Sequence, residues 1–415
     1  MNYQVTEIVA DNGAQDEQAV RVPDVSIIMP CLDEKQSLPH CIANARDALG
    51  QIAKKYGLTG EIVIADNGST DGGQELARSL GARVVPVARR GYGAALIGGC
   101  EGGYGRFLLM GDCDGSYDFT DGVAMIGGLN DGADLVMGNR FAGGISPGAM
   151  PWKNRYIGNP ALSGVLSLFF RAGVRDAHCG LRAITKEAFI RCGLTSSGME
   201  FASEMVIKAR LLDCRIEQVP AKLLPDLRQR QPHLRPWRDG WRHLRYLFML
   251  SPVWAFGVPA LMALLLGALL LAGSCAEYIS PGTFPQLGDY WTLLGSAMVD
   301  VGHLALLMGL AAHLYGMKAG FRRPSAVTRM ARGLVTLEFM LLSGSALIAI
   351  GITLLGFVAF GWTVRGYEEA NSIFPPVIGF LTLTMGVQNV LGGFLMAIIG
   401  GNEARFFDTP LTDGK

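Results

Sequence analysis

Two aspartates, Asp112 and Asp114, lie one residue apart in the stretch GDCDGSYD (residues 111–118), directly after the apolar run RFLLM. Two carboxylates with this spacing at the end of a strand can share a hard divalent cation. Mg²⁺ or Mn²⁺ held in this way usually also binds substrate phosphates. Taken alone, this pair could equally form a solvated acidic turn. The neighbouring motifs are therefore needed to distinguish a cation site from such a turn.

Three further loops carry polar residues and glycine where apolar runs end or helices begin. PCLDE (residues 30–34) ends one run, DNGSTDG (66–72) ends the next, and RRGYGAA (89–95) precedes a helix-like segment. Asp and Asn can hydrogen-bond a base or a ribose, and glycine permits close approach of the backbone to a ligand. Capping of the following helix is the alternative for Asp71. The predicted nucleotide-binding residues are Pro30, Asp33, Glu34, Asp66, Asn67, Arg90 and Gly91.

The RRGYGAA loop is similar to the glycine fingerprint of dinucleotide-binding folds but does not match it. Leu96 stands where the third glycine belongs, and the loop follows a later strand instead of the first. NAD binding is therefore not expected.

Short apolar runs alternate with helix-like segments in the part of the chain that carries these motifs. Parallel strands covered on both faces are nearly continuous apolar runs. Residues 37–49 and 71–80 suit helices. This alternation predicts an α/β sheet with its ligand chemistry at the carboxyl ends of the strands. The predicted strands are residues 25–29, 61–65, 83–87, 106–110 and 134–137.

Four long apolar segments follow residue 250. Each reaches the roughly 20 residues that a helix needs to cross a bilayer. Only 17% of the whole chain is charged, against about 25% in soluble domains. We therefore expect an integral membrane protein, with hydrophobic core helices as the alternative. The predicted spans are residues 253–271, 291–315, 334–362 and 375–399.

Loop charges predict how the spans are oriented. The loop at residues 317–333 has one lysine and four arginines and no acid, whereas the loop at 276–290 has two acids and no base. Basic loops remain in the cytoplasm, so the N-terminal domain and the C-terminal tail are expected there. Residues 1–20 are acidic and lack the apolar core of a signal peptide, which predicts a mobile tail.

The composition argues against a zinc site and against a nucleic-acid-binding site. The eight cysteines are scattered and form no CxxC pair, so buried reduced thiols are expected and a zinc site is not. Lys and Arg number 36, as do Asp and Glu. This balance argues against a nucleic-acid partner, because nucleic-acid binders show a basic excess.

In order along the chain, PCLDE, DNGSTDG, RRGYGAA, DCDGSYD, GNR and DAHCGLR resemble the motifs of family 2 glycosyltransferases with the GT-A fold. Within this family the chain looks like the dolichol-phosphate mannose synthase and polyprenyl-phosphate glucosyltransferase group. The resemblance covers residues 24–250. It implies a GT-A nucleotide-sugar-binding mixed sheet flanked by helices. It also implies a metal-dependent, inverting transfer of a hexosyl unit from a UDP- or GDP-sugar to polyprenyl (dolichyl or undecaprenyl) phosphate.

The resemblance assigns roles by position. Asp33 and Asp66 match residues that touch the ribose and base, while Asp112 and Asp114 match the acidic pair near the metal, Mg²⁺ or Mn²⁺, and the diphosphate. Ser116 stands where members of the group often have Gln as a further metal ligand, so Ser116 or water would complete the set. Arg140 is grouped with the acidic pair as catalytic. The residues that match the lipid-phosphate site are Arg140, Arg155, Asn159 and Arg228.

The chemistry of these residue types agrees with those roles. Arginine binds phosphate bidentately and stays charged, although a surface salt bridge is the alternative for any one of them. A lipid phosphate is already anionic, so it can attack the anomeric carbon without a strong base. Glu200 and Glu204 lie four apart on a predicted helix and share a face. Either glutamate could act as a base, contact a sugar hydroxyl or form a structural ion pair.

Two segments point to a membrane-bound acceptor. Residues 160–170 are strongly apolar and form either a core helix or a lining of the acceptor groove. Residues 237–246 are basic with interleaved tryptophans, which predicts an amphipathic helix on the anionic cytoplasmic leaflet, with a nucleic-acid patch as the alternative. In the second span, Asp300 and His303 suggest a structural contact between helices more than a transport role.

These observations divide the chain into five parts. They are a tail (1–23), a cytoplasmic GT-A domain (24–235), a juxtamembrane basic helix (236–252), a four-helix transmembrane domain (253–400) and a cytoplasmic tail (401–415). Two other functions are a processive polysaccharide synthase, whose QxxRW motif residues 231–237 do not match, and a nucleotide-sensing transporter or scaffold. The resemblance favours a homo-oligomer that serves cell-envelope glycan biosynthesis.

Overall fold

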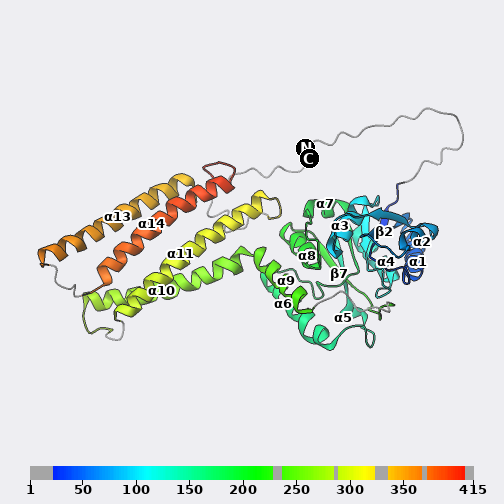
Figure 1. The fold of residues 1–415 in the computed structure, drawn as a ribbon, viewed down its shortest axis with the longest axis horizontal. Coiled ribbons are helices and arrows are strands. Elements are labelled where there is room, and N and C mark those ends of the chain that lie inside the picture. The colour runs from blue at the N-terminus through cyan, green and yellow to red at the C-terminus, as the bar shows by residue number, and fades with distance from the viewer. Residues whose placement is uncertain (1–21, 228–235, 285–287, 323–334, 367–371, 407–415) are drawn as a thin grey trace, which may run out of the picture.

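Seven strands form one mixed sheet in the N-terminal part of the chain (Figure 1). The computed structural model describes residues 22–227, 236–284, 288–322, 335–366 and 372–406. The strand order is β3-β2-β1-β4-β6-β5-β7. The strands are β1 (Val25–Cys31), β2 (Gly60–Asp66), β3 (Arg83–Pro86), β4 (Phe107–Met110), β5 (Leu135–Asn139), β6 (Arg182–Thr185) and β7 (Ile216–Pro220).

The first four strands are parallel neighbours, with β1 between β2 and β4 and with β3 beside β2. Their carboxyl ends therefore meet at one edge of the sheet. The three polar motifs that follow β1, β2 and β4 lie at this edge, as the sequence predicts.

Two strands were not predicted from the sequence. β6 is antiparallel to both β4 and β5, and it has only four residues, one of which is a buried arginine. β7 pairs with β5 at the edge of the sheet and is only half-buried, so it lacks a continuous apolar run. Neither strand therefore has the buried apolar run by which the other strands were predicted.

Helices cover both faces of the sheet. One face packs against α1, α2 and α4, and the other against α3, α6, α7 and α8. The covering helices are α1 (Leu38–Tyr56), α2 (Gly73–Ser79), α3 (Tyr92–Gly102), α4 (Gly122–Asn130), α6 (Asn159–Phe170), α7 (Lys186–Cys192) and α8 (Phe201–Leu211). Three short turns of helix connect these elements, namely η1 (Phe119–Asp121), α5 (Arg140–Gly143) and η2 (Asn154–Gly158). All eight cysteines are free thiols.

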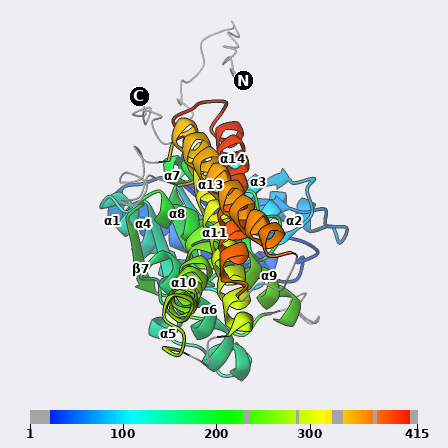
Figure 2. The ribbon, with the colours of Figure 1, turned by 90° about the vertical axis from the view of Figure 1, so that its left-hand side faces the viewer.

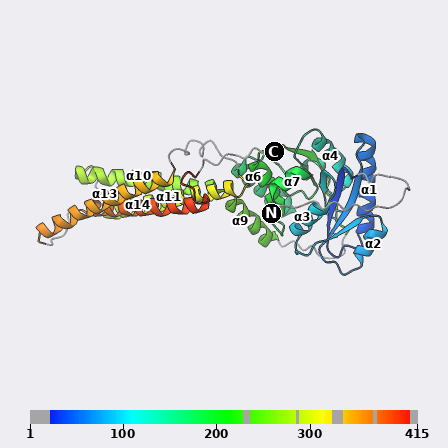
Figure 3. The same cartoon turned by 90° about the horizontal axis from the view of Figure 1, so that it is seen from above.

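Four long apolar helices extend from the sheet domain (Figures 1 and 3). Each is long and apolar enough to cross a membrane. α11 packs against α10 and α14, and α14 packs against α13. Figure 2 looks along these helices from their far end. Their bounds are α10 (Val258–Ile279, preceded by η3, Val253–Gly257), α11 (Asp289–Lys318), α13 (Leu337–Val364) and α14 (Phe374–Ile399). The expected fold class is confirmed.

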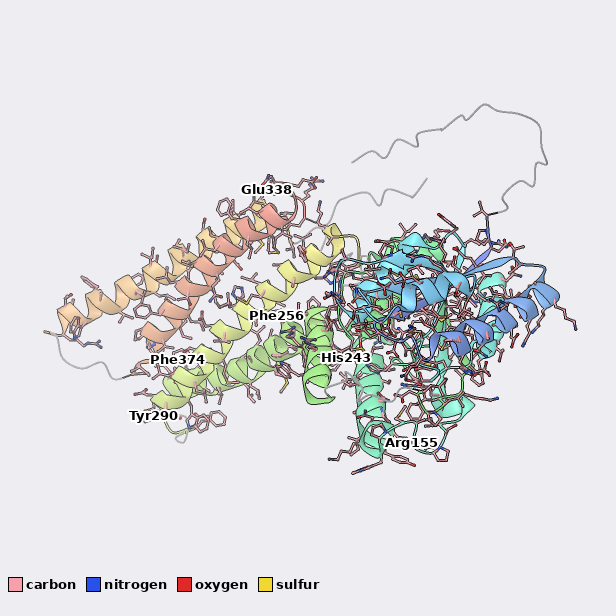
Figure 4. The ribbon with its side chains drawn as sticks, turned by 45° about the vertical axis from the view of Figure 1, so that its right-hand side comes forward. Arg155, His243, Phe256, Tyr290, Glu338 and Phe374 are labelled. Atoms are coloured by element: carbon pink, nitrogen blue, oxygen red, sulfur yellow. The ribbon has the colours of Figure 1, made fainter. Side chains whose placement is uncertain are left out.

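The spans run alternately away from and towards the sheet domain. Figure 4 shows Tyr290 and Phe374 at the far ends of their helices, and Glu338 at the near end of α13. Tyr278 at the end of α10 stacks on Phe374, with ring centroids 5.4 Å apart. The described part of the acidic loop at residues 276–290 is thus at the far end, and the described part of the basic loop at residues 317–333 is at the near end.

α9 (Pro236–Met249) joins the two parts of the molecule (Figure 1). Leu247 and Leu250 are buried in the same core as α3 and α8, while Trp241 and Met249 are exposed. The helix is therefore amphipathic, and its apolar side belongs to the core of the sheet domain.

Several expectations fall outside the described residues. They are the tail at residues 1–20, Arg228, the segment 231–235, and three arginines of the basic loop, Arg323, Arg329 and Arg332.

Candidate active site

The loops after β1 and β2 are fastened to one another. The backbone N–H of Asp33, which has a left-handed φ of 56°, donates to Ser69 Oγ at 2.9 Å. In return, Asp33 Oδ1 accepts from the Thr70 N–H at 2.7 Å. Lys35 N–H donates to Asp71 Oδ2 at 2.8 Å, and Asp71 Oδ1 accepts from the N–H of Gly73, the first residue of α2, at 2.9 Å. Asp71 therefore ties the two loops together and also satisfies the first N–H of α2. The first two motifs therefore form one rigid wall.

Asp66 and Asn67 use their side chains to shape this wall. Asp66 is 2% exposed and accepts from the N–H groups of Gly68 and Ser69 and from Gln74 Nε2. Asn67 donates to the carbonyls of Val87 and Arg89 and accepts from the Gly91 N–H at 2.7 Å. Both predicted nucleotide-binding side chains thus hold backbone in place. The Arg90 guanidinium completes the loop by donating to the Asn67 carbonyl.

The acidic motif lies between the β1 loop and the DAHCGLR loop. Cys113 Sγ donates to the Pro30 carbonyl at 2.9 Å, and Ser37 Oγ donates to the Cys113 carbonyl at 2.6 Å. On the other side, a Cβ at Gly180 would lie 2.8 Å from Asp112 Oδ2. Only glycine allows the DAHCGLR loop to approach this closely.

Tyr92 and Tyr117 complete the surroundings of Asp112. Burial, and then the neighbouring Asp112 carboxylate, raise the pKa of Tyr92 well above its ordinary value. Tyr92 therefore stays protonated and is hydrogen-bonded to Asp112. Tyr117 accepts from the Gly180 N–H at 2.8 Å. Neither tyrosine was predicted from the sequence, although both stand inside the quoted motifs.

The donor set fits a hard divalent cation that is shared with substrate phosphates. Asp114 is 6% exposed, and its Oδ1 accepts from the Ser116 N–H at 2.9 Å, so the motif closes into a turn. Within the described ranges, His, Cys, Asp and Glu form no group of three or more that could hold a metal. Mg²⁺ in such sites takes one or two carboxylates and completes its shell with phosphate and water. Asp112, Asp114 and the Ser116 hydroxyl can supply the protein's share.

Arg140 stands at the carboxyl end of β5 and is locked onto Asp176. Its Nε and Nη2 donate to the two carboxylate oxygens at 2.8 Å each, and its backbone N–H donates to Oδ2 at 3.0 Å. Asp176 is fully buried and Arg140 is 7% exposed. The pair joins the GNR motif to the DAHCGLR motif. Because Nε and Nη2 are engaged, Nη1 is the nitrogen through which Arg140 can reach a phosphate.

The other predicted phosphate ligands lie apart from this pair. Arg155, in η2, is half-buried beside the Tyr156 ring, at 5.5 Å from its centroid. Figure 4 shows it at the lower edge of the sheet domain. Asn159 Nδ2 contacts Met150 Sδ at 3.4 Å. No direct contact between these two and Arg140 is found within the described residues.

A chain of three side chains links the DAHCGLR loop to α9. Ser203 Oγ lies 3.3 Å from His178 Nε2 and 2.9 Å from His243 Nδ1, and the two rings meet edge to face with centroids 4.8 Å apart. Burial, followed by His243, Arg140 and Arg182, lowers the pKa of His178 well below its ordinary value. His178 is therefore neutral at pH 7. Figure 4 shows His243 on α9, beside η3.

The two glutamates of α8 differ sharply. Glu204 is fully buried, pairs with Lys208 Nζ at 2.8 Å and accepts from the Thr195 and Ser196 N–H groups. It is a structural ion pair, one of the alternatives that the sequence left open. Glu200 precedes the first residue of the helix, and its Oε1 accepts from the Gly198 N–H at 3.2 Å.

Asp176, like the two tyrosines, was not predicted from the sequence as part of this site. It is the buried partner of Arg140, and it opens the DAHCGLR motif, to which no role was given. Asp176 has arginines at positions 175 and 182 of the same stretch, so no pattern along the chain singles out Arg140 as its partner.

Comparison with known proteins gives two matches to family models. Residues 26–193 match "Glycosyl transferase family 2", and residues 310–400 match "Glycosyltransferase family 2 C-terminal transmembrane region". The first match contains the acidic pair and the Arg140–Asp176 pair, and the second contains α13 and α14.

Three curated relatives show how far the similarity extends. The "Low-salt glycan biosynthesis hexosyltransferase Agl6" of Haloferax volcanii is 32% identical over 382 residues, which is 91% of this chain and 89% of that protein. The "Dolichyl-phosphate hexose transferase" of the same organism is 28% identical over 48% of this chain and 81% of its own length. The "Polyprenol monophosphomannose synthase" of Mycolicibacterium smegmatis is 25% identical, over 51% and 82% respectively.

Proposed function

Because this chain belongs to glycosyltransferase family 2, we propose that it transfers one hexosyl unit from a nucleotide sugar to polyprenyl phosphate at the cytoplasmic face of the membrane. It is a membrane glycosyltransferase, with a family 2 catalytic domain and a family 2 transmembrane region. The donor, the metal, the acceptor and the membrane face are the parts that we propose. The division of the chain at residues 23, 235, 252 and 400 belongs to the same proposal.

The contact between the DAHCGLR loop and the acidic motif is the observation that supports this proposal most strongly. Gly180 lets the DAHCGLR loop lie against Asp112, and the same loop holds Arg140 through Asp176. A site for a metal-bound diphosphate and a fixed guanidinium are therefore neighbours at one edge of the sheet. Two anionic substrates that must react with one another need this arrangement, because their charges otherwise keep them apart.

In the proposed reaction, the lipid phosphate oxygen attacks the anomeric carbon while the bond to the nucleotide diphosphate breaks, so the configuration inverts. Asp112, Asp114 and Ser116 would hold Mg²⁺ or Mn²⁺, which would neutralise the departing diphosphate. Arg140, with Arg155, Asn159 and Arg228, would orient the acceptor phosphate. Pro30, Asp33, Glu34 and Arg90 would line the nucleotide between the walls that Asp66 and Asn67 shape.

Aromatic contacts at the base of the sheet domain support a lipid acceptor. Phe169 at the end of α6 stacks on Trp254 of η3, with centroids 5.0 Å apart, and meets Phe248 of α9 edge to face at 5.2 Å. The end of the apolar helix α6 thus lies beside the start of the first span. An isoprenoid chain would leave the membrane at this junction with little exposure to water.

One contact supports the cytoplasmic placement. Phe321 and Arg322 belong to the basic loop after α11. Phe321 packs with the core around α8, and Arg322 Nη2 donates to the Leu250 carbonyl at 2.6 Å. The described start of the basic loop therefore lies against the catalytic domain. This supports our proposal that both face the cytoplasm, where basic loops remain.

The names of the relatives support a chemical class for the acceptor and a later use for the product. Two of them name dolichyl-phosphate or polyprenol phosphate chemistry, and the relative that matches 91% of this chain names glycan biosynthesis. We extend both to this chain, so its product would be a lipid-phosphate sugar that later transferases of surface glycan assembly consume. The homo-oligomer expected from the sequence is kept as part of this proposal.

A transfer assay tests the proposal. The full chain in detergent is incubated with polyprenyl phosphate, Mg²⁺ or Mn²⁺, and labelled UDP- or GDP-hexoses, and label is followed into the organic phase. We expect transfer from one donor, its loss on chelation of the metal, and its restoration when metal is returned. Absence of lipid-soluble label with every donor would contradict the proposal.

A further inference from the structure

A buried carboxylate oxygen of Glu200 is left without a protein partner. Its Oε1 accepts from the Gly198 N–H at 3.2 Å. Its Oε2 is buried and has no hydrogen-bond partner among the residues that the structure describes. A buried acceptor without a donor costs about 1–3 kcal/mol, and more when it is charged. Glu204, four residues on, shows the contrast, because Lys208 and two backbone N–H groups satisfy it.

The loop that carries Glu200 packs directly on the RRGYGAA loop. A Cβ at Gly91 would overlap the Ser197 carbonyl, and one at Gly93 would lie 2.8 Å from the Gly198 carbonyl. The Ala94 N–H donates to the Ser197 carbonyl at 3.2 Å. Between these glycines stands Tyr92, which is hydrogen-bonded to Asp112. Glu200 is therefore one loop away from the acidic pair.

The chemistry of a carboxylate limits what can satisfy Oε2. An ionised carboxylate only accepts hydrogen bonds, and it repels a diphosphate or a lipid phosphate. A second metal is not supported either, because Glu200 has no second carboxylate one residue away, as Asp112 and Asp114 have, and belongs to no group of three acidic, His or Cys ligands among the described residues. Two parts of the donor bring hydrogen-bond donors without negative charge, namely the nucleoside and the hexosyl unit. Because the nucleoside is proposed to bind at the loops after β1 and β2, the hexosyl unit is the part left for Glu200.

We propose that Glu200 Oε2 accepts a hydrogen bond from one hydroxyl of the donor's hexosyl unit and thereby selects among sugars. This inference rests on the proposed function and adds to it the residue that recognises the sugar. Sites that hydrogen-bond a substrate hydroxyl reject analogues that lack it, because the buried protein group is then left unpaired. Glu200 touches the substrate in this proposal but takes no proton from it.

The test uses Glu200→Gln together with donors that lack one hydroxyl at a time. For the wild type, we expect kcat/KM to fall roughly 10- to 100-fold with the deoxy donor that lacks the contacted hydroxyl. With the complete donor, kcat/KM of Glu200→Gln should be lower than that of the wild type by a similar factor. With the deoxy donor that lacks the contacted hydroxyl, kcat/KM of Glu200→Gln should fall little further. The other deoxy donors should be affected equally in both proteins. Glu187→Gln, an exposed glutamate of α7, is the matched control and should behave as wild type.

A binding measurement keeps the inference testable without turnover. By calorimetry with UDP-glucose and GDP-mannose, Glu200→Gln should weaken binding of the accepted nucleotide sugar. Binding of the corresponding nucleotide diphosphate should be unchanged, which also shows that the variant is folded. Equal affinities of both proteins for the nucleotide sugar, or an equal response of both to every deoxy donor, would overturn the role of Glu200. Failure of the proposed function has a different signature, namely no transfer by the wild type with any complete donor.

Discussion

Arg140 and Asp176 show how a charged residue can be both structural and available for chemistry. Two of the guanidinium nitrogens and the backbone N–H hold a fully buried carboxylate. The buried pair fixes the guanidinium in direction, and a fixed cation needs no reorganisation when an anionic substrate arrives. As a consequence, loss of either side chain would leave the other buried without a partner, which strongly destabilises the fold.

Removal of Asp176 should therefore be more harmful than removal of the whole pair. We expect Asp176→Ala to lower the free energy of unfolding by about 3–5 kcal/mol, because it leaves Arg140 buried and uncompensated. The double variant Arg140→Met/Asp176→Leu should be less destabilised than Asp176→Ala. Thermal unfolding of the full chain in detergent measures this order. A double variant that is less stable than Asp176→Ala would contradict the account of the pair.

Loss of one carboxylate of the acidic pair should abolish transfer without unfolding the protein. We expect Asp114→Asn to lower kcat by at least about a hundredfold, since it removes a charge from the group that would hold the metal and the diphosphate. Its isosteric amide can still accept from the Ser116 N–H. Asp47→Asn, at an exposed position of α1, is the control. Retention of wild-type kcat by Asp114→Asn would remove the acidic pair from the mechanism.

The pH dependence of stability should report on His178. Burial first, and then three nearby cationic groups, lower its pKa in the folded state below 6.5. Below about pH 6.5 the unfolded chain gains a proton on this residue and the folded chain does not, so stability falls as the pH drops. His178→Gln should weaken this fall between about pH 7.5 and pH 5.5. Parallel unfolding curves of both proteins at the two pH values would show that His178 does not contribute.

The sequence could predict which residues lie together at the strand ends but not what each side chain contacts. Asp33, Asp66 and Asn67 stand at strand ends, where position alone predicts proximity to a nucleotide. Position cannot show that Asp66 and Asn67 use their hydrogen bonds on neighbouring loops, because those loops come from other strands. The same holds for Glu200 and Glu204, which share a helix face but meet different partners.

At the scale of elements, the polar residues of α11 are joined through α14. Asp300 Oδ1 accepts from Gln388 Nε2 at 3.0 Å and from Thr384 Oγ1 at 2.8 Å, and Gln388 Oε1 lies 2.7 Å from His303 Nδ1. The sequence predicted a structural contact between helices at Asp300 and His303. The structure shows that Gln388 bridges them, which spacing along one helix cannot reveal.

Replacement of the bridging amide should loosen the two helices. We expect Gln388→Leu to destabilise the membrane domain by about 1 kcal/mol, the size measured for hydrogen bonds between membrane helices. Asn389→Leu, at the next position of α14, is a comparison variant, because Asn389 makes only a 3.4 Å contact with Ser343. Unfolding in detergent would measure both. A smaller effect for Gln388→Leu than for Asn389→Leu would contradict the bridging role.

Elements with a continuous apolar run were predictable, and the others were not. The first five strands and the four spans appear in the sequence as such runs. β6 and β7 do not, since one contains the buried Arg182 and the other is a half-buried edge strand. The antiparallel insertion of β6 between β4 and β5 is set by long-range pairing, which leaves no local pattern.

At the scale of the whole molecule, α9 makes the catalytic domain and the spans one unit. Its Leu247 lies in the catalytic core together with Leu250, which directly follows the helix. Its His243 reaches Ser203, and its Phe248 meets Phe169 beside the first span. The two loops at which we propose that the phosphates bind are thus connected through α9 to the start of the first span. This arrangement suits an acceptor whose phosphate is in water and whose chain is in lipid.

The intact mass of the lipid product tests this account most directly. The full chain is reconstituted in vesicles that contain polyprenyl phosphate, supplied with divalent metal and the preferred nucleotide sugar, and the extracted lipid is analysed by mass spectrometry. The account predicts polyprenyl phosphate that carries a single hexosyl unit, and none with Asp114→Asn. A polymer of sugars, or unmodified polyprenyl phosphate alongside consumed donor, would contradict it.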